Sequence, residues 1–219
     1  MFENNPKVFA VGEDVGMIGG VNQGFAGIQE KFGKYRITDT GIRESSIIGQ
    51  GIGSALRGLR PIVEIQYLDY VYWALQTLSD DLSTLQYRTS GGQKAPVIIR
   101  TRGHRLEGIW HSGSPMGTLI NSLRGIHILV PRNFVEAVGM YNTLLSSDEP
   151  GIIIEPLNSY RLKENLPTNL SEIKVEIGCP SILREGSDIS IVTYGSMCKI
   201  VMDSAEPVSY THLTLPTIE

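Results

Sequence analysis

Two side chains in this sequence lie where acid–base chemistry is expected, and the first of them is His111. It belongs to a long loop rich in glycine and serine, residues 103–117, which follows an apolar strand-like run. Ligands of parallel α/β sheets bind beyond the carboxyl ends of the strands, so this loop is expected to border a site. His127 differs, because its apolar surroundings (GIHILV) favour a structural histidine in the core or at an edge.

The second candidate is Glu44, which follows the run YRITDT and a short Gly41-Ile42 turn and begins an expected helix. A carboxylate there gains about 0.3–1 kcal/mol from the helix macrodipole, which would be a structural role. In apolar surroundings the same group would hold a proton more tightly and serve in acid–base catalysis. Tyr67 and Tyr70 are either core aromatics or a platform for ring stacking. Composition leaves both pairs of alternatives open.

Other catalytic signatures are absent from the sequence. It contains no GxSxG, GxxxxGK[ST] or HExxH motif, and the two cysteines, Cys179 and Cys198, have no metal-ligand spacing. The glycines at positions 49, 51 and 53 fall within a helical stretch rather than at a strand-to-helix turn, which disfavours a dinucleotide site. We expect instead a helix face kept small for the close approach of another backbone segment.

The elements that must position these residues are indicated by the spacing of apolar residues. Strand-like runs occupy residues 8–11, 35–40, 60–67, 96–102, 126–130 and 151–155. Helical spacing occupies residues 23–32, with Gly33 as a C-cap, and residues 43–56, 71–87 and 134–145. This alternation predicts an α/β fold with a parallel sheet flanked by helices.

Composition restricts the class of protein. The chain has 219 residues, 41% of them hydrophobic, and a net charge of −4. It is too apolar for a disordered chain, has no run long enough to span a bilayer, and lacks the basic charge that nucleic-acid binding requires. The first twenty residues have no basic signal-peptide start. We expect a cytoplasmic protein without nucleic-acid or membrane partners.

A change in composition divides the chain. Residues 1–165 are expected to form one complete α/β domain, and the polar residues 166–180 a linker. Residues 181–206 are predicted to be the truncated start of a second α/β domain, with a hairpin or paired strands and then a helix that Pro207 ends. Residues 207–219 (PVSYTHLTLPTIE) resemble translated sequencing-adaptor read-through, and we expect a non-native tail.

A series of motifs carries a family resemblance. In order, they are GEDVG (12–16), KFGKYRITDTGIRE (31–44), IIGQGIGSALRGLRPIVEIQYLDY (47–70), QYRTSGGQ (86–93), HSGS (111–114), LRGIHILVPRN (123–133) and DEPGIIIEP (148–156). Together they resemble the beta subunit of the thiamine-diphosphate-dependent first component of 2-oxoacid dehydrogenase complexes, over about residues 8–206. The IQYLDY stretch resembles the branched-chain branch more than the pyruvate branch, and several details resemble fused alpha–beta forms. A transketolase-like pyrimidine-binding fold is implied.

The resemblance implies roles for three residues. Glu44 matches the glutamate that hydrogen-bonds N1′ of the aminopyrimidine, where burial is expected to favour its protonated form. Tyr70 matches the aromatic residue that packs on the pyrimidine ring. His111 matches the histidine that faces the 2-oxoacid substrate and the channel for the lipoyl arm. The chain departs from the family at Gly41, where proline is usual, and at Gly113, where glutamine is usual.

The resemblance also implies partners. The superfamily binds the diphosphate and Mg²⁺ through a GDG-containing motif, which this sequence lacks. The chain is therefore expected to supply the pyrimidine half of a thiamine diphosphate site, with Mg²⁺ held by the partner, and to be inactive alone. The implied partners are an alpha subunit or fused alpha region, a second beta copy in a heterotetramer, and a lipoyl-bearing acyltransferase. The family can also hold a structural K⁺ ion through backbone carbonyls.

Two alternatives stay open. Another enzyme of the transketolase superfamily, such as a transketolase or a deoxyxylulose-phosphate synthase, would carry its own diphosphate motif in the same chain. A non-catalytic binding or assembly module would be indicated by a Glu44 that is exposed to solvent and far from any cleft.

Overall fold

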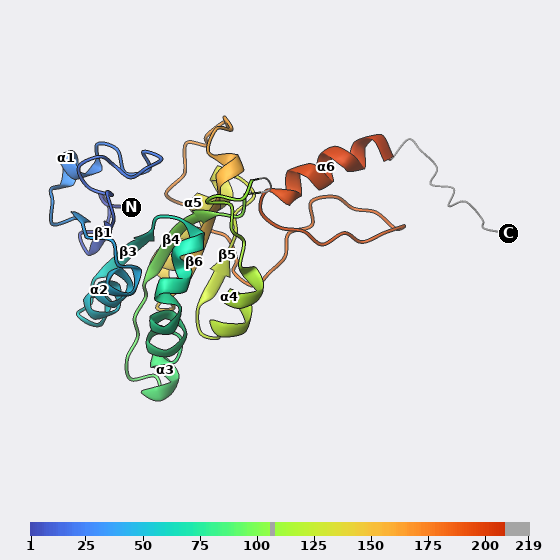
Figure 1. Cartoon of the computed structure of the whole chain (residues 1–219). Coiled ribbons are helices and arrows are strands. Elements are labelled where there is room, and N and C mark those ends of the chain that lie inside the picture. The colour runs from blue at the N-terminus through green and yellow to red at the C-terminus, as the bar shows by residue number, and fades with distance from the viewer. Residues whose placement is uncertain (106–107, 209–219) are drawn as a thin grey trace.

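The computed structural model describes residues 1–105 and 108–208, and a six-stranded parallel sheet forms its centre (Figure 1). Its strands are β1 (Val8–Gly12), β2 (Ile37–Asp39), β3 (Arg60–Ile65), β4 (Ile98–Gly103), β5 (His127–Leu129) and β6 (Gly151–Pro156). Their order is β2-β1-β3-β4-β6-β5, and every neighbouring pair is parallel. The predicted α/β class is confirmed.

Helices lie on both faces of this sheet. They are α1 (Ile28–Phe32), α2 (Glu44–Leu56), α3 (Leu85–Arg88), α4 (Met116–Ser122), α5 (Phe134–Ser146) and α6 (Met197–Val208), with the 3₁₀ segments η1 (Leu68–Ala74) and η3 (Leu157–Ser159) and the π-helix η2 (Thr77–Leu82). None of the helices in the described ranges is long and apolar enough to cross a membrane.

Alternation along the central strands divides the core into two layers. Val63 and Ile99 belong to one buried cluster, together with apolar side chains of α2, η1, η2 and α4. Ile62 and Ile98, one residue earlier on the same strands, belong to the other cluster, with side chains of α5. Because both faces of the sheet are covered, β3 and β4 read as continuous apolar runs interrupted only by a few charged residues.

The helices differ from the sequence-based expectation in three places. The helix expected at residues 23–32 begins only at Ile28, because Gln23 and Gly27 have φ angles of 61° and 73°, which a right-handed helix excludes. Gly33 ends it, as predicted. The helix expected at residues 71–87 is divided into η1, η2 and α3. The short helix α4 was not predicted, because Pro115 and Gly117 at its start are residues typical of loops.

Gly51 is the glycine of α2 that the packing requires. A Cβ atom there would lie 2.6 Å from Cγ1 of Val63 and 3.1 Å from Cγ1 of Val97. Around Gly49 and Gly53, by contrast, a Cβ atom would meet open space. The expected small helix face is therefore reduced to Gly51, where side chains of Val63 and Val97, rather than another backbone segment, lie against α2.

Residues 166–180 cross the outside of α5 rather than acting as a free linker. The side-chain amide of Asn142 donates to the carbonyl of Ile173 at 2.9 Å. The hydroxyl of Thr143 donates to the carbonyl of Val175 at 2.7 Å and accepts from its N–H at 3.0 Å. This stretch is therefore attached to the α/β domain by side chains of its last long helix.

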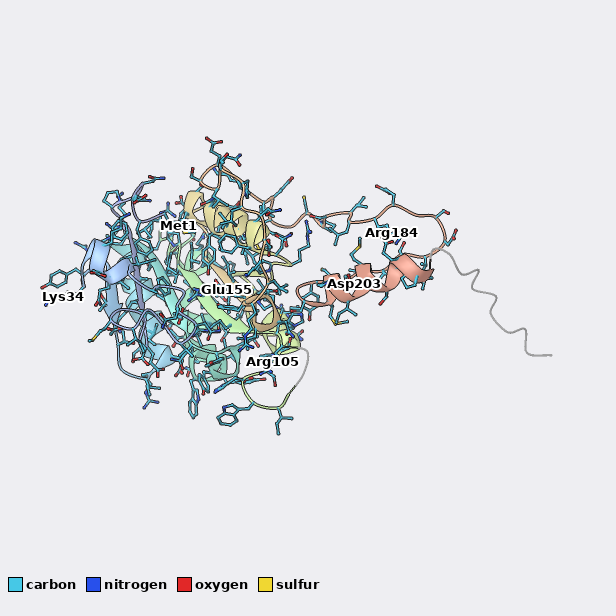
Figure 2. All side chains as sticks on the ribbon, turned by 90° about the horizontal axis from the view of Figure 1, so that it is seen from above. Met1, Lys34, Arg105, Glu155, Arg184 and Asp203 are labelled. Carbon is cyan, nitrogen blue, oxygen red and sulfur yellow. The ribbon has the colours of Figure 1, made fainter. Side chains whose placement is uncertain are left out.

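The expected hairpin within residues 181–194 is wrong, since no strand is formed there in the described part of the chain. Ile182, Ile189 and Val192 are 75%, 78% and 97% exposed, and an isolated hairpin has too little core to be stable. The helix α6 follows and includes Pro207, so the expectation that Pro207 ends it is also wrong. Residues 181–208, which include α6, extend away from the sheet in Figures 1 and 2. Beyond Val208, the predicted non-native tail lies outside the described residues.

Candidate functional site

The three predicted site residues lie on segments that meet at one edge of the sheet. Because the strands are parallel, their carboxyl ends share that edge. There β2 leads into α2 and Glu44, β3 leads into η1 and Tyr70, and β4 leads into the loop of His111. These strands lie within four consecutive positions of the sheet order, so the edge brings together residues that are distant in sequence.

An aromatic cluster surrounds His111. The imidazole ring stacks on the ring of Tyr67, with a centroid distance of 3.9 Å and an interplanar angle of 13°. The ring of Tyr70 meets the imidazole edge-on, with a centroid distance of 5.6 Å and an interplanar angle of 86°. The centroids of the Tyr70 and Tyr67 rings are 6.2 Å apart. The ring centroid of Trp110 lies 4.8 Å from that of the imidazole. Tyr70 and His111, which were predicted as separate site residues, are therefore in contact, and Tyr67 is a stacking partner of His111.

Glu44 is the first residue of α2 and is buried, with 6% of its surface exposed. Burial of a carboxylate normally requires a partner. Within residues 1–105 and 108–208, however, no hydrogen bond or ion pair engages the Glu44 carboxylate. The residue before it, Arg43, provides no side-chain cap for the helix. Glu44 is thus a buried acid whose oxygen atoms are available to a ligand.

Negative charge accumulates around this acid. Burial raises the pKa of Glu13, and the nearby carboxylates of Asp14, Glu44 and Glu64 raise it further. Burial likewise raises the pKa of Tyr70, with added contributions from Glu13, Asp69, Tyr67 and Glu44. Glu13 and Tyr70 therefore favour their protonated, neutral forms, and the carboxylates around them suit a ligand that carries positive charge or donates protons.

The backbone of the histidine loop is closed at its base. The N–H of His104 donates to the carbonyl of Gly113 at 3.3 Å, and Nδ1 of His104 lies 3.0 Å from Oγ of Ser114. Both His104 and His111 have positive φ angles, 49° and 53°. Such angles are uncommon for non-glycine residues, so the loop has an unusual and specific backbone path.

The packing of this loop favours glycine at position 113. A Cβ atom at Gly113 would lie 1.6 Å from Oδ1 of Asp69, which belongs to η1. A side chain at position 113 would therefore require the Asp69 carboxylate to move, and glycine leaves that carboxylate its place.

A buried ionic network joins β3, β4 and β6, and it was not among the features predicted from the sequence. Arg100 pairs with Glu155 through two hydrogen bonds of 2.9 and 2.8 Å and also contacts Glu64. The hydroxyls of Tyr141 (2.8 Å) and Tyr160 donate to Glu155. Figure 2 shows Glu155 within the body of the domain. The signal was present, since charged residues inside the strand-like runs PIVEI and PVIIRTR must find partners on the same face.

Competing charges determine the protonation of this network. Burial raises the pKa of Glu155, but the Arg100 charge and the hydrogen bonds from Arg100 and both tyrosines hold that pKa below its ordinary value. Burial lowers the pKa of Arg100, but Glu155, Tyr160 and Glu64 raise it above its ordinary value. Both groups are therefore ionised, and the network links side chains of the neighbouring strands β3, β4 and β6.

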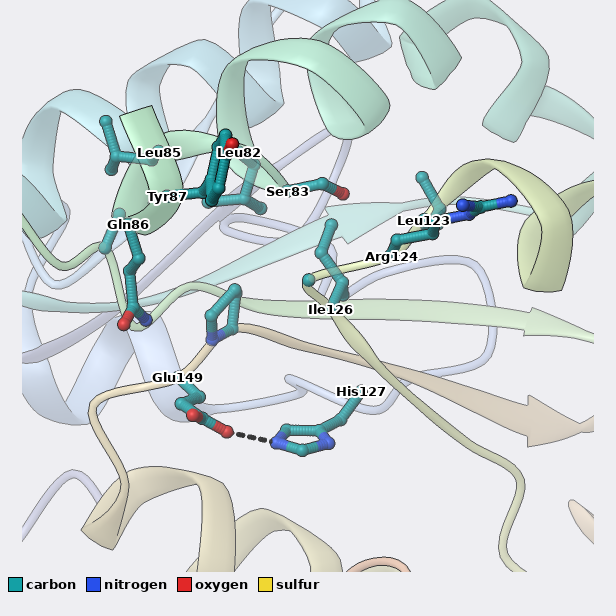
Figure 3. Close-up of a pocket in the computed structure, with 13 residues that line it drawn as sticks. Leu82, Ser83, Leu85, Gln86, Tyr87, Leu123, Arg124, Ile126, His127 and Glu149 are labelled. Carbon is teal, nitrogen blue, oxygen red and sulfur yellow. Dashed lines mark hydrogen bonds and ion pairs between the residues drawn. The ribbon is translucent and has the colours of Figure 1, made fainter. Parts of the chain in front are cut away.

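A cavity of about 520 Å³ lies at the opposite edge of the sheet, near the amino ends of β5 and β6 (Figure 3). At its rim, Nε2 of His127 lies 2.6 Å from Oε2 of Glu149, as Figure 3 shows. His127 is the first residue of the edge strand β5, which agrees with a structural histidine. None of the predicted site residues lines this cavity, so we do not place the site there.

Metal ligation within the described part of the chain is not supported by its side chains. No group of three or more His, Cys, Asp or Glu residues there could hold a metal ion. Cys179 and Cys198 are both free.

Comparison with known proteins gives a family and several relatives. Residues 1–163 match the family described as the transketolase pyrimidine binding domain. The 2-oxoisovalerate dehydrogenase subunit beta of Bacillus subtilis (strain 168) is 32% identical over 206 residues, which cover 93% of this chain and 62% of that protein. The pyruvate dehydrogenase E1 component subunit beta of the same organism is 31% identical over 222 residues, covering 99% of this chain and 67% of that protein.

A similar relative and a solved structure complete the comparison. The pyruvate dehydrogenase E1 component subunit beta of Staphylococcus aureus (strain Mu50 / ATCC 700699) is 32% identical over 222 residues, covering 99% of this chain and 67% of that protein. The structure of a split gene transketolase, described as an inactive beta4 tetramer, matches with a TM-score of 0.74 and 18% identity. The match covers 95% of this chain and 63% of the transketolase chain. That structure supports the fold. The chain thus spans about two thirds of the length of these proteins.

Proposed function

Because the chain belongs to the transketolase pyrimidine-binding domain family, we propose that it is the beta region of a thiamine-diphosphate-dependent 2-oxoacid dehydrogenase. Its reaction is the oxidative decarboxylation of a 2-oxoacid with reductive acylation of a lipoyl group. The observation that carries the proposal is the buried Glu44 without a partner in the described residues, at the sheet edge that also holds Tyr70 and His111. Relatives at about one third identity named as dehydrogenase beta subunits support the choice of reaction.

The residues at this edge fit the pyrimidine ring of thiamine diphosphate. When bound, this cofactor supplies a carbon nucleophile that adds to the carbonyl group of a 2-oxoacid. Glu44 would hold N1′ of the pyrimidine through a shared proton, since its carboxyl group is buried and has no partner among the described residues. Tyr70, whose hydroxyl stays neutral at physiological pH, packs on the ring.

His111 is proposed to face the substrate and the lipoyl arm. Imidazole side chains are common general acids and bases, which suits proton movement during acyl transfer. His111 contacts Tyr70 edge-on, so the residue assigned to the cofactor and the residue assigned to the substrate lie side by side.

The diphosphate half of the site is proposed to lie on an alpha subunit or fused alpha region. The chain has no GDG motif, so the partner would hold Mg²⁺, and the chain would be inactive alone. A second beta copy in a heterotetramer, a lipoyl-bearing acyltransferase, a structural K⁺ ion and a cytoplasmic location complete the proposal. The IQYLDY stretch favours branched-chain 2-oxoacids as substrates.

The alternative enzyme classes are less well supported. The likeness to a split gene transketolase is at 18% identity and bears on the fold alone. A non-catalytic assembly module was expected to expose Glu44, whereas that residue is buried. A dehydrogenase beta region therefore remains the function that these observations favour.

Reconstitution tests this function. The chain is mixed with the alpha subunit of a bacterial relative, thiamine diphosphate and Mg²⁺, and 2-oxoacid-dependent reduction of an artificial electron acceptor is measured. We expect turnover with the mixture and none with the chain alone. Faster turnover of 2-oxoisovalerate than of pyruvate would support branched-chain specificity. Turnover by the chain without an alpha subunit would contradict the proposed division of the site.

A further inference from the structure

We propose that Tyr67 is a positioning residue for His111: its phenol ring sets the plane of the imidazole, and Arg102 in turn holds Tyr67 in place. This inference rests on the proposed function, in which His111 faces the substrate. It adds a residue that the family resemblance did not assign.

The orientation of the His111 imidazole is set by its contacts with aromatic rings. In the described residues, no hydrogen bond engages either nitrogen atom of its imidazole. The ring lies nearly parallel to that of Tyr67, at 3.9 Å and 13°, and Tyr70 meets its edge. Stacking restrains the plane of a ring without occupying its nitrogen atoms. Both nitrogens of His111 therefore stay available for proton transfer while the ring direction is fixed.

The loop backbone alone would not fix this ring. His111 has a φ of 53° and lies between glycines at 108 and 113, in a segment that makes few backbone hydrogen bonds to the sheet. A catalytic imidazole must be held within roughly 0.5 Å and 10–20° of its productive geometry by residues that are themselves fixed. The stacking partner must therefore come from a more rigid element, and Tyr67 lies two residues beyond the end of the buried strand β3.

Arg102 makes Tyr67 rigid. This arginine of β4 is fully buried, and its Nε donates to the carbonyl of Gln66 at 3.0 Å. Its Nη2 donates to Oε1 of Glu64 at 3.0 Å. The first bond fixes the backbone immediately before Tyr67, and the guanidinium carbon lies 5.4 Å from the centroid of the Tyr67 ring, within cation–π range. The plane of His111 is thus linked through Tyr67 to the buried charges of the sheet.

The stack is tested by NMR on the 219-residue chain labelled in its histidine rings. His111→Gln assigns the His111 signals, and the variants are Tyr67→Leu, Tyr67→Phe and Tyr67→Trp. The matched control is Tyr87→Leu, because Tyr87 is an exposed tyrosine beside the 520 Å³ cavity at the other edge. In the native chain the His111 ring protons should lie upfield, because they sit over the face of a phenol.

The expected pattern separates stacking from general stability. The upfield shift should disappear in Tyr67→Leu, persist in Tyr67→Phe, and stay unchanged in Tyr87→Leu. Tyr67→Trp should move the signals further upfield, and it keeps the test decisive if the leucine variant fails to fold. An unchanged His111 signal in both Tyr67→Leu and Tyr67→Trp would overturn the proposal.

Activity supplies a second readout. In the reconstituted enzyme, kcat/KM for the lipoyl acceptor should fall about 2- to 13-fold in Tyr67→Leu, the factor that corresponds to an aromatic pair, and should recover in Tyr67→Phe. A lost stack with unchanged acyl transfer would overturn the positioning role. Normal acyl transfer in His111→Ala would instead overturn the proposed role of His111, and the NMR signal would still decide independently whether the stack exists.

Discussion

Replacement of Glu155 by glutamine should strongly destabilise the domain. Glu155 accepts hydrogen bonds from Arg100, Tyr141 and Tyr160, and the glutamine variant leaves Arg100 with Glu64 as its remaining counter-ion, which Arg102 also uses. Breaking one side of a buried ion pair costs about 3–5 kcal/mol, because the other charge stays buried. This is a large part of the roughly 5–15 kcal/mol that stabilises a typical domain.

Urea denaturation followed by circular dichroism measures this loss, with Asp148→Asn as the matched control. Asp148 also pairs with two cations, Arg60 and Lys94, but is 54% exposed, so removal of its charge should cost much less. The variants should differ clearly in midpoint with little change in slope. A Glu155→Gln midpoint equal to that of Asp148→Asn would refute the claim that the buried network stabilises the fold.

The same variant should change how stability depends on pH. The pKa of Glu155 is lowered in the folded chain, so its contribution is fully present above the ordinary glutamate value of 4.5 and is lost as pH falls through the lower folded value. The native chain should therefore lose its advantage over Glu155→Gln in acid. An advantage that stays constant as pH is lowered through that range would contradict this account.

The remaining predictions concern α2 and the histidine loop. Gly51→Ala should destabilise the chain by about 1–3 kcal/mol through overpacking against Val63, whereas Gly53→Ala, which meets open space, should stabilise it by about 0.5–1 kcal/mol; equal melting temperatures for the two variants would contradict the packing argument. His111→Ala should depress acyl transfer to a lipoyl acceptor and leave the circular dichroism spectrum and melting temperature close to native, so full overall activity would show that this histidine is structural.

Much of the fold could be predicted because its signals are local. The runs of β-branched residues at 60–67 and 96–102 can be stable only as strands covered on both faces, and β3 and β4 are such strands. Glu44 and His111 could be selected because they follow strands, and parallel strands place such residues at one edge. The resemblance added Tyr70, and the structure places it against His111.

Contacts between distant residues could not be predicted from these local signals. Nothing in the sequence around Tyr67 distinguishes it from Tyr70, and its stacking role depends on a loop more than forty positions away. The division of residues 71–87 into three kinds of helix was likewise not indicated by the apolar spacing. The hairpin expected at 181–194 was wrong because apolar alternation favours a strand only when a neighbouring strand is present.

The central claim is that Glu44 activates the pyrimidine of thiamine diphosphate, and proton exchange at C2 of the cofactor tests it most directly. The reconstituted enzyme is compared with its Glu44→Gln variant and with Glu30→Gln, an exposed control on α1, and exchange of the C2 proton into D₂O is followed by NMR. We predict that Glu44→Gln still binds thiamine diphosphate but exchanges its C2 proton about 10²–10⁴-fold more slowly, while Glu30→Gln is unchanged. Exchange at the native rate in Glu44→Gln would contradict the account.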